Sequence, residues 1–197
     1  SFPTRRSSDL EQELRRATTI DTTFGLAYYK LALTRGWLVG ASDSVAEAAM
    51  GRATRYSTPL PEHVRTVINA YRAFLGHDLP TARALYEQLI ARNPADADAW
   101  YGLGEAWFHD DGPGDRAMHM TEGLRAFRRT LALDPNYALA YEHVGSMLVD
   151  AARPGSMIAL LPGDSIAVTH DALGRPALDS TVRAAAVRRA RTEVVAL

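Results

Sequence analysis

Apolar residues recur along most of this chain at the three- and four-residue spacing of an amphipathic helix. Short polar turns interrupt this pattern near residues 22, 59, 94 and 135. At the last of them, Asp134-Pro135 separates two amphipathic runs. Proline cannot continue a helix interior and disfavours the helical conformation of the preceding residue, so this pair should end one helix and begin the next. The pattern predicts helix-turn-helix joints about 37, 35 and 41 residues apart.

The segments around these joints are related in sequence. Tyr86, Pro94, Trp100, Leu103 and Gly104 lie 41 residues before Phe127, Pro135, Tyr141, Val144 and Gly145. A third copy surrounds residue 22, and a weaker fourth copy covers residues 45–71, with helical faces at Ala46, Met50 and Ala53 and at Val64, Val67, Ile68 and Tyr71. Repeats of this length predict stacked helix pairs, because one pair is too small to bury its own apolar face.

The best copy has Trp100, Leu103, Gly104 and Trp107 on its first helix, then Gly123, Phe127, Thr130 and Pro135. In these residues the chain resembles a tetratricopeptide-repeat protein, although Gly123 and Thr130 stand where that family usually has alanine. The resemblance implies an all-α, right-handed solenoid of helical hairpins over about residues 11–150. It also implies that bulky side chains on one helix fill holes at small residues such as Gly104 on the next. Core positions are then expected at Tyr28, Trp100, Trp107 and Tyr141.

The two ends depart from the repeat pattern. Residues 1–10 match nothing else in the chain and closely resemble a translated sequencing adapter, so we expect a non-native or disordered leader and a truncated chain. Residues 151–197 are expected to form an irregular segment and a C-terminal helix that closes the array. Within them, Met157–Leu161 and Ser165–Val168 flank a Pro-Gly turn and are predicted to pair as a short β-hairpin. A helix should resume near Leu178, capped by Asp179 or Ser180.

Composition narrows the function classes. A hydrophobic content of 47% and a charged content of 23% favour a folded chain, while a net charge of -1 gives no general attraction to nucleic acid or acidic membranes. The absence of cysteine excludes disulfides, thiolate metal sites and cysteine nucleophiles. No stretch approaches the roughly 18 apolar residues of a membrane span. Compartment and oligomeric state are left open, with the cytoplasm favoured.

Three candidate chemistries were weighed against simpler interpretations. Gly163-Asp164-Ser165 resembles a serine-hydrolase block, but no downstream Asp-x-x-His follows, which favours a turn. The loop 109–120 contains five potential metal ligands: His109, Asp110, Asp111, Asp115 and His119. Its glycines favour a flexible, solvated and protruding loop, in which no helical i, i+4 pair fixes two ligands together. Arginine pairs at 15/16, 128/129 and 188/189 fit a solvated helix face better than a nucleic-acid site. We therefore predict no cofactor, no metal and no enzymatic activity.

The tetratricopeptide resemblance also implies a partner-binding groove lined by the first helix of each pair. Transferred to this chain, the groove residues are Tyr29, Lys30, Leu33, Arg65, Asn69, Arg72, Tyr101, Glu105, His109, Glu142, His143 and Ser146. The earlier copies contribute basic residues and the later ones acidic residues, which suits a peptide or helix bound in one orientation.

The predicted function is a protein-interaction scaffold for a protein or peptide partner, without nucleic-acid or membrane binding. The Trp-Tyr-Gly-Leu-Gly-Glu helix (residues 100–105) followed by a long loop is similar to C-terminal portions of some bacterial serine/threonine kinases and other signalling proteins. That similarity implies a place in a larger bacterial regulatory protein. Two alternatives stay open: a fragment of an enzyme, such as a kinase or hydrolase, whose catalytic domain lies outside this chain, and a helical-repeat RNA binder, which would need a continuous basic groove.

Overall fold

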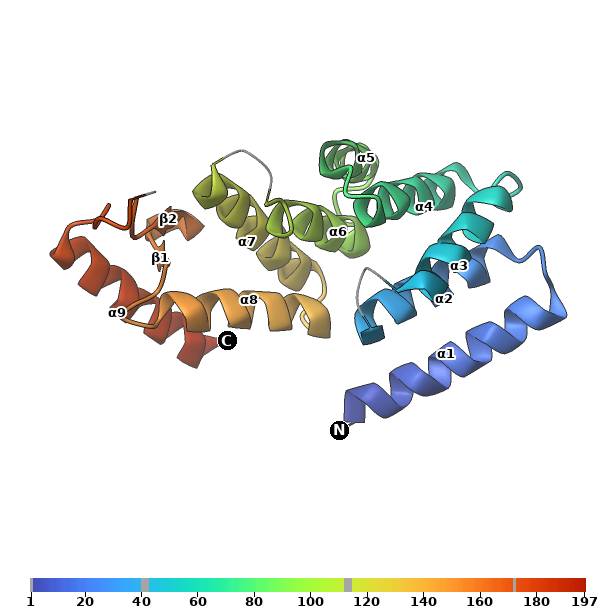
Figure 1. The fold of residues 1–197 in the computed structure, drawn as a ribbon, viewed down its shortest axis with the longest axis horizontal. Helices are drawn as coiled ribbons and strands as arrows, with labels where there is room; N and C mark the ends of the chain where they lie inside the picture. Colours follow the sequence, from blue (N-terminus) through green and yellow to red (C-terminus); the bar gives the residue numbers. More distant parts are fainter. Residues whose placement is uncertain (1, 40–42, 112–114, 172) are drawn as a thin grey trace. The chain divides into compact units, whose positions relative to one another are not determined.

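The computed structural model describes residues 2–39, 43–111, 115–171 and 173–197, with the backbone alone for residues 2–7 (Figure 1). Apart from one short β-hairpin and an isolated bridge between His170 and Pro176, the regular elements of the described residues are helices. Its elements are α1 (Phe2–Ile20), α2 (Gly25–Val39), α3 (Ser44–Arg55), α4 (Glu62–Leu75), α5 (Leu79–Arg92), α6 (Ala97–Phe108), α7 (Arg116–Leu133), α8 (Ala138–Ala151), β1 (Ile158–Leu160), a 3-10 turn (Pro162–Asp164), β2 (Ile166–Val168) and α9 (Ser180–Ala196). The predicted all-α architecture of helical hairpins and the predicted β-hairpin are both confirmed.

Turns lie at each of the four predicted joints. The helices that meet there are separated by residues 21–24, 56–61, 93–96 and 134–137. Aspartate side chains accept hydrogen bonds from backbone N–H groups at the start of α3, α6, α7 and α9, which satisfies donors that a helix start leaves unpaired. Among the described residues, no helix combines the length and the apolar character needed to cross a bilayer.

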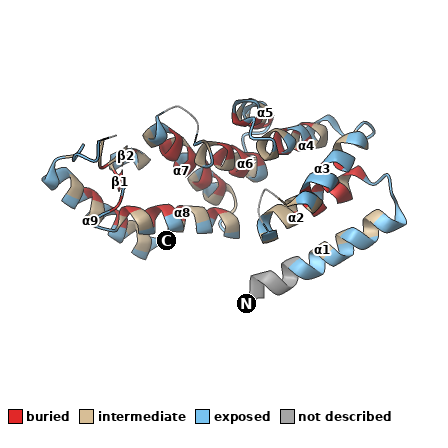
Figure 2. Cartoon of the chain, viewed as in Figure 1, coloured by how far each residue is buried: buried red, intermediate tan, exposed pale blue. Residues whose placement is uncertain are grey.

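The chain forms two compact units, unit 1 (Ser1–Leu89) and unit 2 (Ile90–Leu197). In unit 1, α2 and α3 form a hairpin, with α1 and α4 packed beside it. Small residues on α3 (Ala46, Ala49 and Ala53) are buried and let the two helices approach closely. Figure 2 shows this pattern: the buried positions gather on α2 and α3, whereas the described part of α1 is mostly exposed. The core of unit 1 therefore lies within the α2–α3 hairpin and under α4.

In unit 2, α6 and α7 form the tightest hairpin. Phe127 on α7 is fully buried and lies against Gly104 on α6, where an added Cβ would stand 2.5 Å from the Phe127 ring. This contact confirms the prediction that Gly104 is a helix-packing position. Helix α8 packs on α7, and its buried residues recur every three or four positions: Ala140, Val144, Met147, Leu148 and Ala151.

The segment after Asp150 belongs to the core of unit 2. Strands β1 and β2 pair antiparallel, with Ile158 opposite Val168 and Leu160 opposite Ile166. Gly163 has φ +72° in the turn between them, a conformation that glycine adopts without a steric penalty. The strands pack against α7 and α9, and α9 packs on α8. Asp179 caps α9, as predicted, by accepting a hydrogen bond from the Thr181 N–H at 2.7 Å.

Two side-chain contacts fasten this hairpin to α7. The Thr121 hydroxyl accepts a hydrogen bond from the Ile166 N–H at 2.8 Å. Arg128 pairs with Asp164 of the turn at 2.6 Å and also with Glu193 of α9. The hairpin is thus tied to α7 by a buried hydrogen bond and by a half-buried arginine that also engages α9.

The predicted aromatic core is only partly confirmed. Tyr28 is buried, but Trp100 and Trp107 are half-buried, and Tyr141 is 36% exposed. The prediction for Tyr141 is wrong because this residue lies outside the stripe of α8 that faces α7. Trp100 lies over the joint before α6, where its Nε1 donates to the Pro94 carbonyl at 3.1 Å.

Residues 2–10 are part of α1, which runs without a break to Ile20. The expectation of a disordered leader therefore differs from the structure over these residues, because an uninterrupted helical backbone extends through them. Leu10 is nevertheless 49% exposed, and among the described apolar side chains of α1 the first that packs on the core of unit 1 is Leu14. The non-native origin of residues 1–10 stays a prediction.

Candidate functional site

The first helices of unit 1, α2 and α4, expose polar residues on one side and bury apolar ones on the other. Of the predicted partner-binding residues, Lys30, Asn69 and Arg72 are exposed. Leu33 is half-buried against the core, and half-buried Arg65 donates a hydrogen bond to the Leu60 carbonyl. We call the surface formed by Lys30, Leu33, Arg65, Asn69 and Arg72 the unit-1 face.

Tyr29 was predicted to line the groove but is buried in the core of unit 1. Its ring contacts that of Tyr71 on α4 edge to face, with centroids 6.0 Å apart. The ammonium of Lys30 lies 5.5 Å from the centre of the Tyr29 ring. Tyr29 therefore packs beneath the unit-1 face and does not contact solvent. In the sequence, a basic residue follows each of the two tyrosines: Lys30 follows Tyr29, and Arg72 follows Tyr71.

In unit 2, the six predicted residues of α6 and α8 also divide by burial. Tyr101 is only 6% exposed and belongs to the core. The centroid of its ring lies 5.0 Å from that of Tyr137 and 5.7 Å from that of Phe127. The other five residues reach the surface to some extent: Glu105 and His143 are half-buried, and His109, Glu142 and Ser146 are exposed. We call these five the unit-2 face.

Three residues of the unit-2 face converge. Oε1 of Glu105 lies 2.8 Å from Nε2 of His143, and Oε2 of Glu105 lies 3.8 Å from Nε2 of His109. One ligand atom from each of the three residues lies within 4.8 Å of the other two. Glu105 lies on α6 and His109 is the residue that caps the C-terminal end of this helix; their four-residue spacing places both on the same side. His143 comes from α8, so packing of α8 beside α6 completes this Glu–His cluster (Glu105, His109 and His143).

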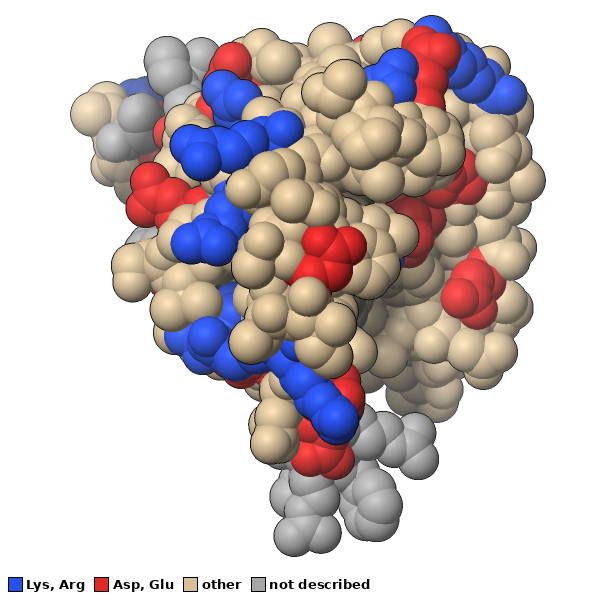
Figure 3. All heavy atoms as spheres, turned by 90° about the vertical axis from the view of Figure 1, so that its right-hand side faces the viewer, with Lys and Arg blue, Asp and Glu red and all other residues tan. Residues whose placement is uncertain are grey.

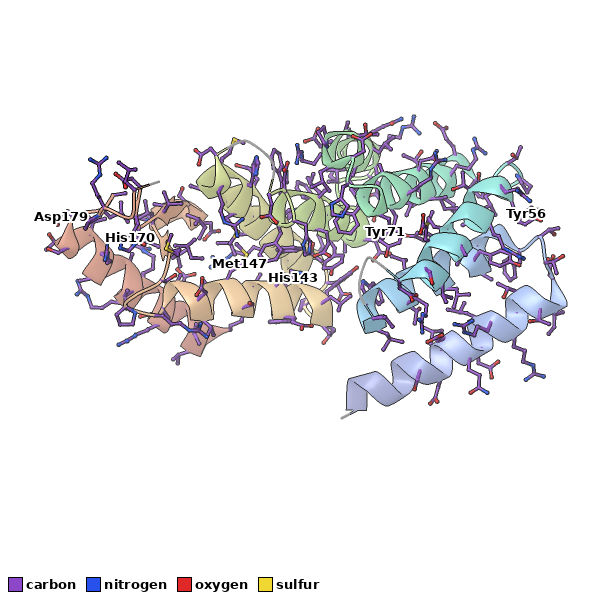
Figure 4. All side chains as sticks on the ribbon, viewed as in Figure 1. Tyr56, Tyr71, His143, Met147, His170 and Asp179 are labelled. Carbon is purple, nitrogen blue, oxygen red and sulfur yellow. The ribbon has the colours of Figure 1, made fainter. Side chains whose placement is uncertain are left out.

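The His143 ring is held from two directions. Its Nδ1 lies 2.9 Å from the Leu139 carbonyl, one helical turn earlier. Aromatic rings surround it, with centroid distances of 4.6 Å to Phe127, 5.3 Å to Phe108 and 5.9 Å to Tyr101. Figure 4 shows His143 and Met147 on the side of α8 toward α6 and α7. The imidazole therefore has little rotational freedom, and its Nε2 atom is directed at Glu105.

Burial and charge act together in this cluster. Burial disfavours the charged form of His143, but contact with the Glu105 carboxylate outweighs that effect, and the pKa of His143 is raised. Burial and the neighbouring Glu105 carboxylate both raise the pKa of the Tyr101 hydroxyl. Glu105 Oε1 is buried and accepts no hydrogen bond of standard geometry from the described residues, although His143 Nε2 is so close.

The loop residues that the sequence offers as metal ligands are mostly engaged elsewhere. Asp111 pairs with Arg116 at 2.6 Å, Asp115 caps α7, and Nδ1 of His119 lies 3.0 Å from the Asp110 carbonyl. Because α7 begins at Arg116, residues 116–120 of the predicted loop are helical, and residues 112–114 fall outside the described chain. Only His109 joins a ligand cluster. Its partner Glu105 lies four residues earlier, outside the predicted loop, and this i, i+4 spacing is the sequence signal that could have identified the pair.

The candidate serine-hydrolase block around Ser165 is explained by local structure. Gly163 and Asp164 form the turn of the β-hairpin, and the Ser165 carbonyl accepts a hydrogen bond from the Leu161 N–H at 2.7 Å. The interpretation of this stretch as a turn is confirmed. A separate pocket of about 450 Å³ lies in unit 2 and was not predicted; its lining residues are Pro154, Pro176, Leu178, Ser180, Arg183, Ala184, Val187 and Arg191.

Comparisons with known proteins agree with the repeat pattern over part of the chain. Residues 69–112, which contain α5 and α6, match the family model described as tetratricopeptide repeat. Among solved structures, the chain is similar to one described as the crystal structure of MamA, at 18% sequence identity and a TM-score of 0.40, covering 73% of this chain and 80% of that chain. No curated protein sequence matches the chain. The predicted tetratricopeptide resemblance is therefore confirmed over the matched residues, and the similarity to signalling kinases stays a prediction.

Proposed function

We propose that this chain, which carries a tetratricopeptide-repeat segment, is a protein-interaction scaffold that binds a peptide or helix on the exposed faces of its first helices. The observation that carries the proposal is the two-sided character of α2 and α4. Each buries its tyrosine and aliphatic side chains in the core of unit 1 and presents Lys30, Asn69 or Arg72 to solvent. Stacked helix pairs bury a shared core in this way and leave one helix of each pair to contact partners.

The charge of each face indicates the chemistry of its partner. The unit-1 face carries three basic residues, Lys30, Arg65 and Arg72, and no acidic one. It should therefore favour an acidic segment, with charge setting orientation and association rate. The unit-2 face carries Glu105 and Glu142 and should favour a segment with basic or imidazole groups.

Surface charge also favours a protein partner over RNA. Figure 3 shows basic and acidic groups interspersed on the face that it displays, with large neutral areas between them. A helical-repeat RNA binder would present a continuous basic surface to the phosphates. We further propose, from sequence resemblance alone, that the chain belongs to a larger bacterial regulatory protein and has no catalytic role of its own.

The test is selection of binding peptides from a displayed library with the purified chain, followed by affinity measurements. We expect acidic peptides, and we expect the Lys30→Glu/Arg72→Glu variant to bind them at least about tenfold more weakly, because two charge reversals at about 0.7 kcal/mol each give that factor. The matched control is Arg188→Glu/Arg189→Glu, which makes the same charge change at exposed positions of α9. Equal binding by all three proteins would rule out the unit-1 face as the binding surface.

A further inference from the structure

Peptide binding on the unit-2 face does not explain why the side chains of Glu105, His109 and His143 converge on one another. We propose that Glu105, His109 and His143 form a binding site for a divalent transition metal of the zinc type. Two imidazole nitrogens and one carboxylate oxygen converge there from two helices. Side chains of these types, in this number, hold zinc at sites where three protein ligands leave a further position open. The inference stands on the geometry of this cluster and does not depend on peptide binding.

The distances fit a metal with little rearrangement. Metal–ligand bonds of about 2.0–2.1 Å in a tetrahedral site place ligand atoms about 3.3 Å apart. Here Oε1 of Glu105 lies 2.8 Å from Nε2 of His143, and the other oxygen, Oε2, lies 3.8 Å from Nε2 of His109. A set with one ligand atom from each residue lies within 4.8 Å. Since the side chain of His109 is 48% exposed, a turn of that one side chain brings the third ligand into range.

The orientation of His143 is the one that a metal ligand requires. In the neutral ring, a proton on Nδ1 is donated to the Leu139 carbonyl at 2.9 Å, which leaves the lone pair on Nε2 directed at the cluster. Metal-binding histidines commonly donate their other ring nitrogen to a backbone carbonyl in this way. Glu105 Oε1 is buried and lies 2.8 Å from Nε2 of His143, so a carboxylate oxygen stands beside that lone pair.

The surroundings set the class of metal and its access. Hard cations such as Mg²⁺ and Ca²⁺ prefer oxygen ligands, whereas an imidazole-rich set favours Zn²⁺ and its neighbours in the first transition row. Phe108 and Phe127 form an apolar wall on the inner side, which strengthens charge–charge attraction by lowering the local dielectric. His109 lies at the solvent side and leaves an entry path. A three-residue set would also leave one coordination position for water or for a donor atom of a bound partner.

The experiment is calorimetric titration of the full untagged chain with ZnCl₂. We expect one strong binding event per chain. His109→Ala, at the exposed end of α6, should weaken it by at least tenfold, because even loss of a residue that only orients a ligand costs about 10- to 100-fold in metal affinity. His143→Gln should have a similar or larger effect. His77→Asn is the control, since His77 is an exposed histidine in unit 1 with positive φ, which asparagine tolerates.

A second readout separates this site from adventitious binding to surface histidines. Co²⁺ bound by the wild-type chain should show the visible absorption of a four-coordinate ion, and this absorption should be lost in His109→Ala while circular dichroism confirms an unchanged helix content. Retention of the strong site in both cluster variants, its loss in His77→Asn, or absence of strong binding by the wild-type chain would each overturn the proposal.

Discussion

Replacing Gly104 with alanine tests the closest helix–helix contact of unit 2. The added Cβ would lie 2.5 Å from Cε1 and 2.6 Å from Cδ1 of Phe127. Carbon atoms in favourable contact stand about 3.5–4.0 Å apart, so the substitution forces the two helices or the ring to move by about 1 Å. The ring is fully buried and also contacts Tyr101, Phe108 and His143, which leaves it no free direction of retreat.

The magnitude follows from two opposing effects. Alanine stabilises a helix interior by about 0.5–1 kcal/mol relative to glycine. Overpacking a closely packed core costs about 1–3 kcal/mol. The chain supplies a matched control in Gly145, which occupies the equivalent position 41 residues later. Among the described residues, an added Cβ there would meet only Cδ2 of Leu197, at 3.5 Å. Gly145→Ala receives the helix gain without the clash, so the two variants should differ in unfolding free energy by about 1–3 kcal/mol.

The measurement is urea unfolding of the full chain, monitored by circular dichroism and by tryptophan fluorescence. Trp100 and Trp107 on α6 contribute to the fluorescence. Replacing Phe127 with leucine should cost less stability in the Gly104→Ala background than in the wild type, because the smaller side chain relieves the clash. Equal stability of Gly104→Ala and Gly145→Ala would refute the steric account of Gly104.

Two further predictions concern polar contacts. Thr121→Val should lower the unfolding free energy by about 1–3 kcal/mol, because it leaves the buried Ile166 N–H without its acceptor. Thr121→Ser keeps the hydroxyl and serves as the control. Urea unfolding of both variants would show whether the hydroxyl matters. The Arg35 guanidinium holds the pKa of Asp43 at about 2, below its ordinary value of 3.8. This contact should therefore stabilise the chain fully above about pH 4 and lose its effect as pH falls toward 2, so the stability difference between wild type and Asp43→Asn should shrink over that interval. A difference that stays constant with pH would exclude the ion pair as its source.

The cluster residues show where sequence reasoning succeeded and where it failed. The spacing of Glu105 and His109 is visible in the sequence and places both on one side of α6. The participation of His143 is not visible, because it depends on which side of α8 meets α6. Side-chain burial is likewise not visible in the sequence. The groove prediction includes Tyr29 and Tyr101, yet both lie in the cores of their units.

Local signals in the sequence were sufficient to predict the helical hairpins, their four joints and the β-hairpin, although not the helical backbone of residues 2–10 or 116–120. Proline, aspartate caps and glycine turns act on the backbone within a few residues, so their effects can be read without knowing the rest of the fold. Only the tertiary structure decided that Tyr141 faces solvent, that Phe127 requires a glycine at 104, and that one carboxylate and two imidazoles meet. Those outcomes depend on how neighbouring helices cross and which stripe of each is covered, and packing between segments distant in the chain sets both.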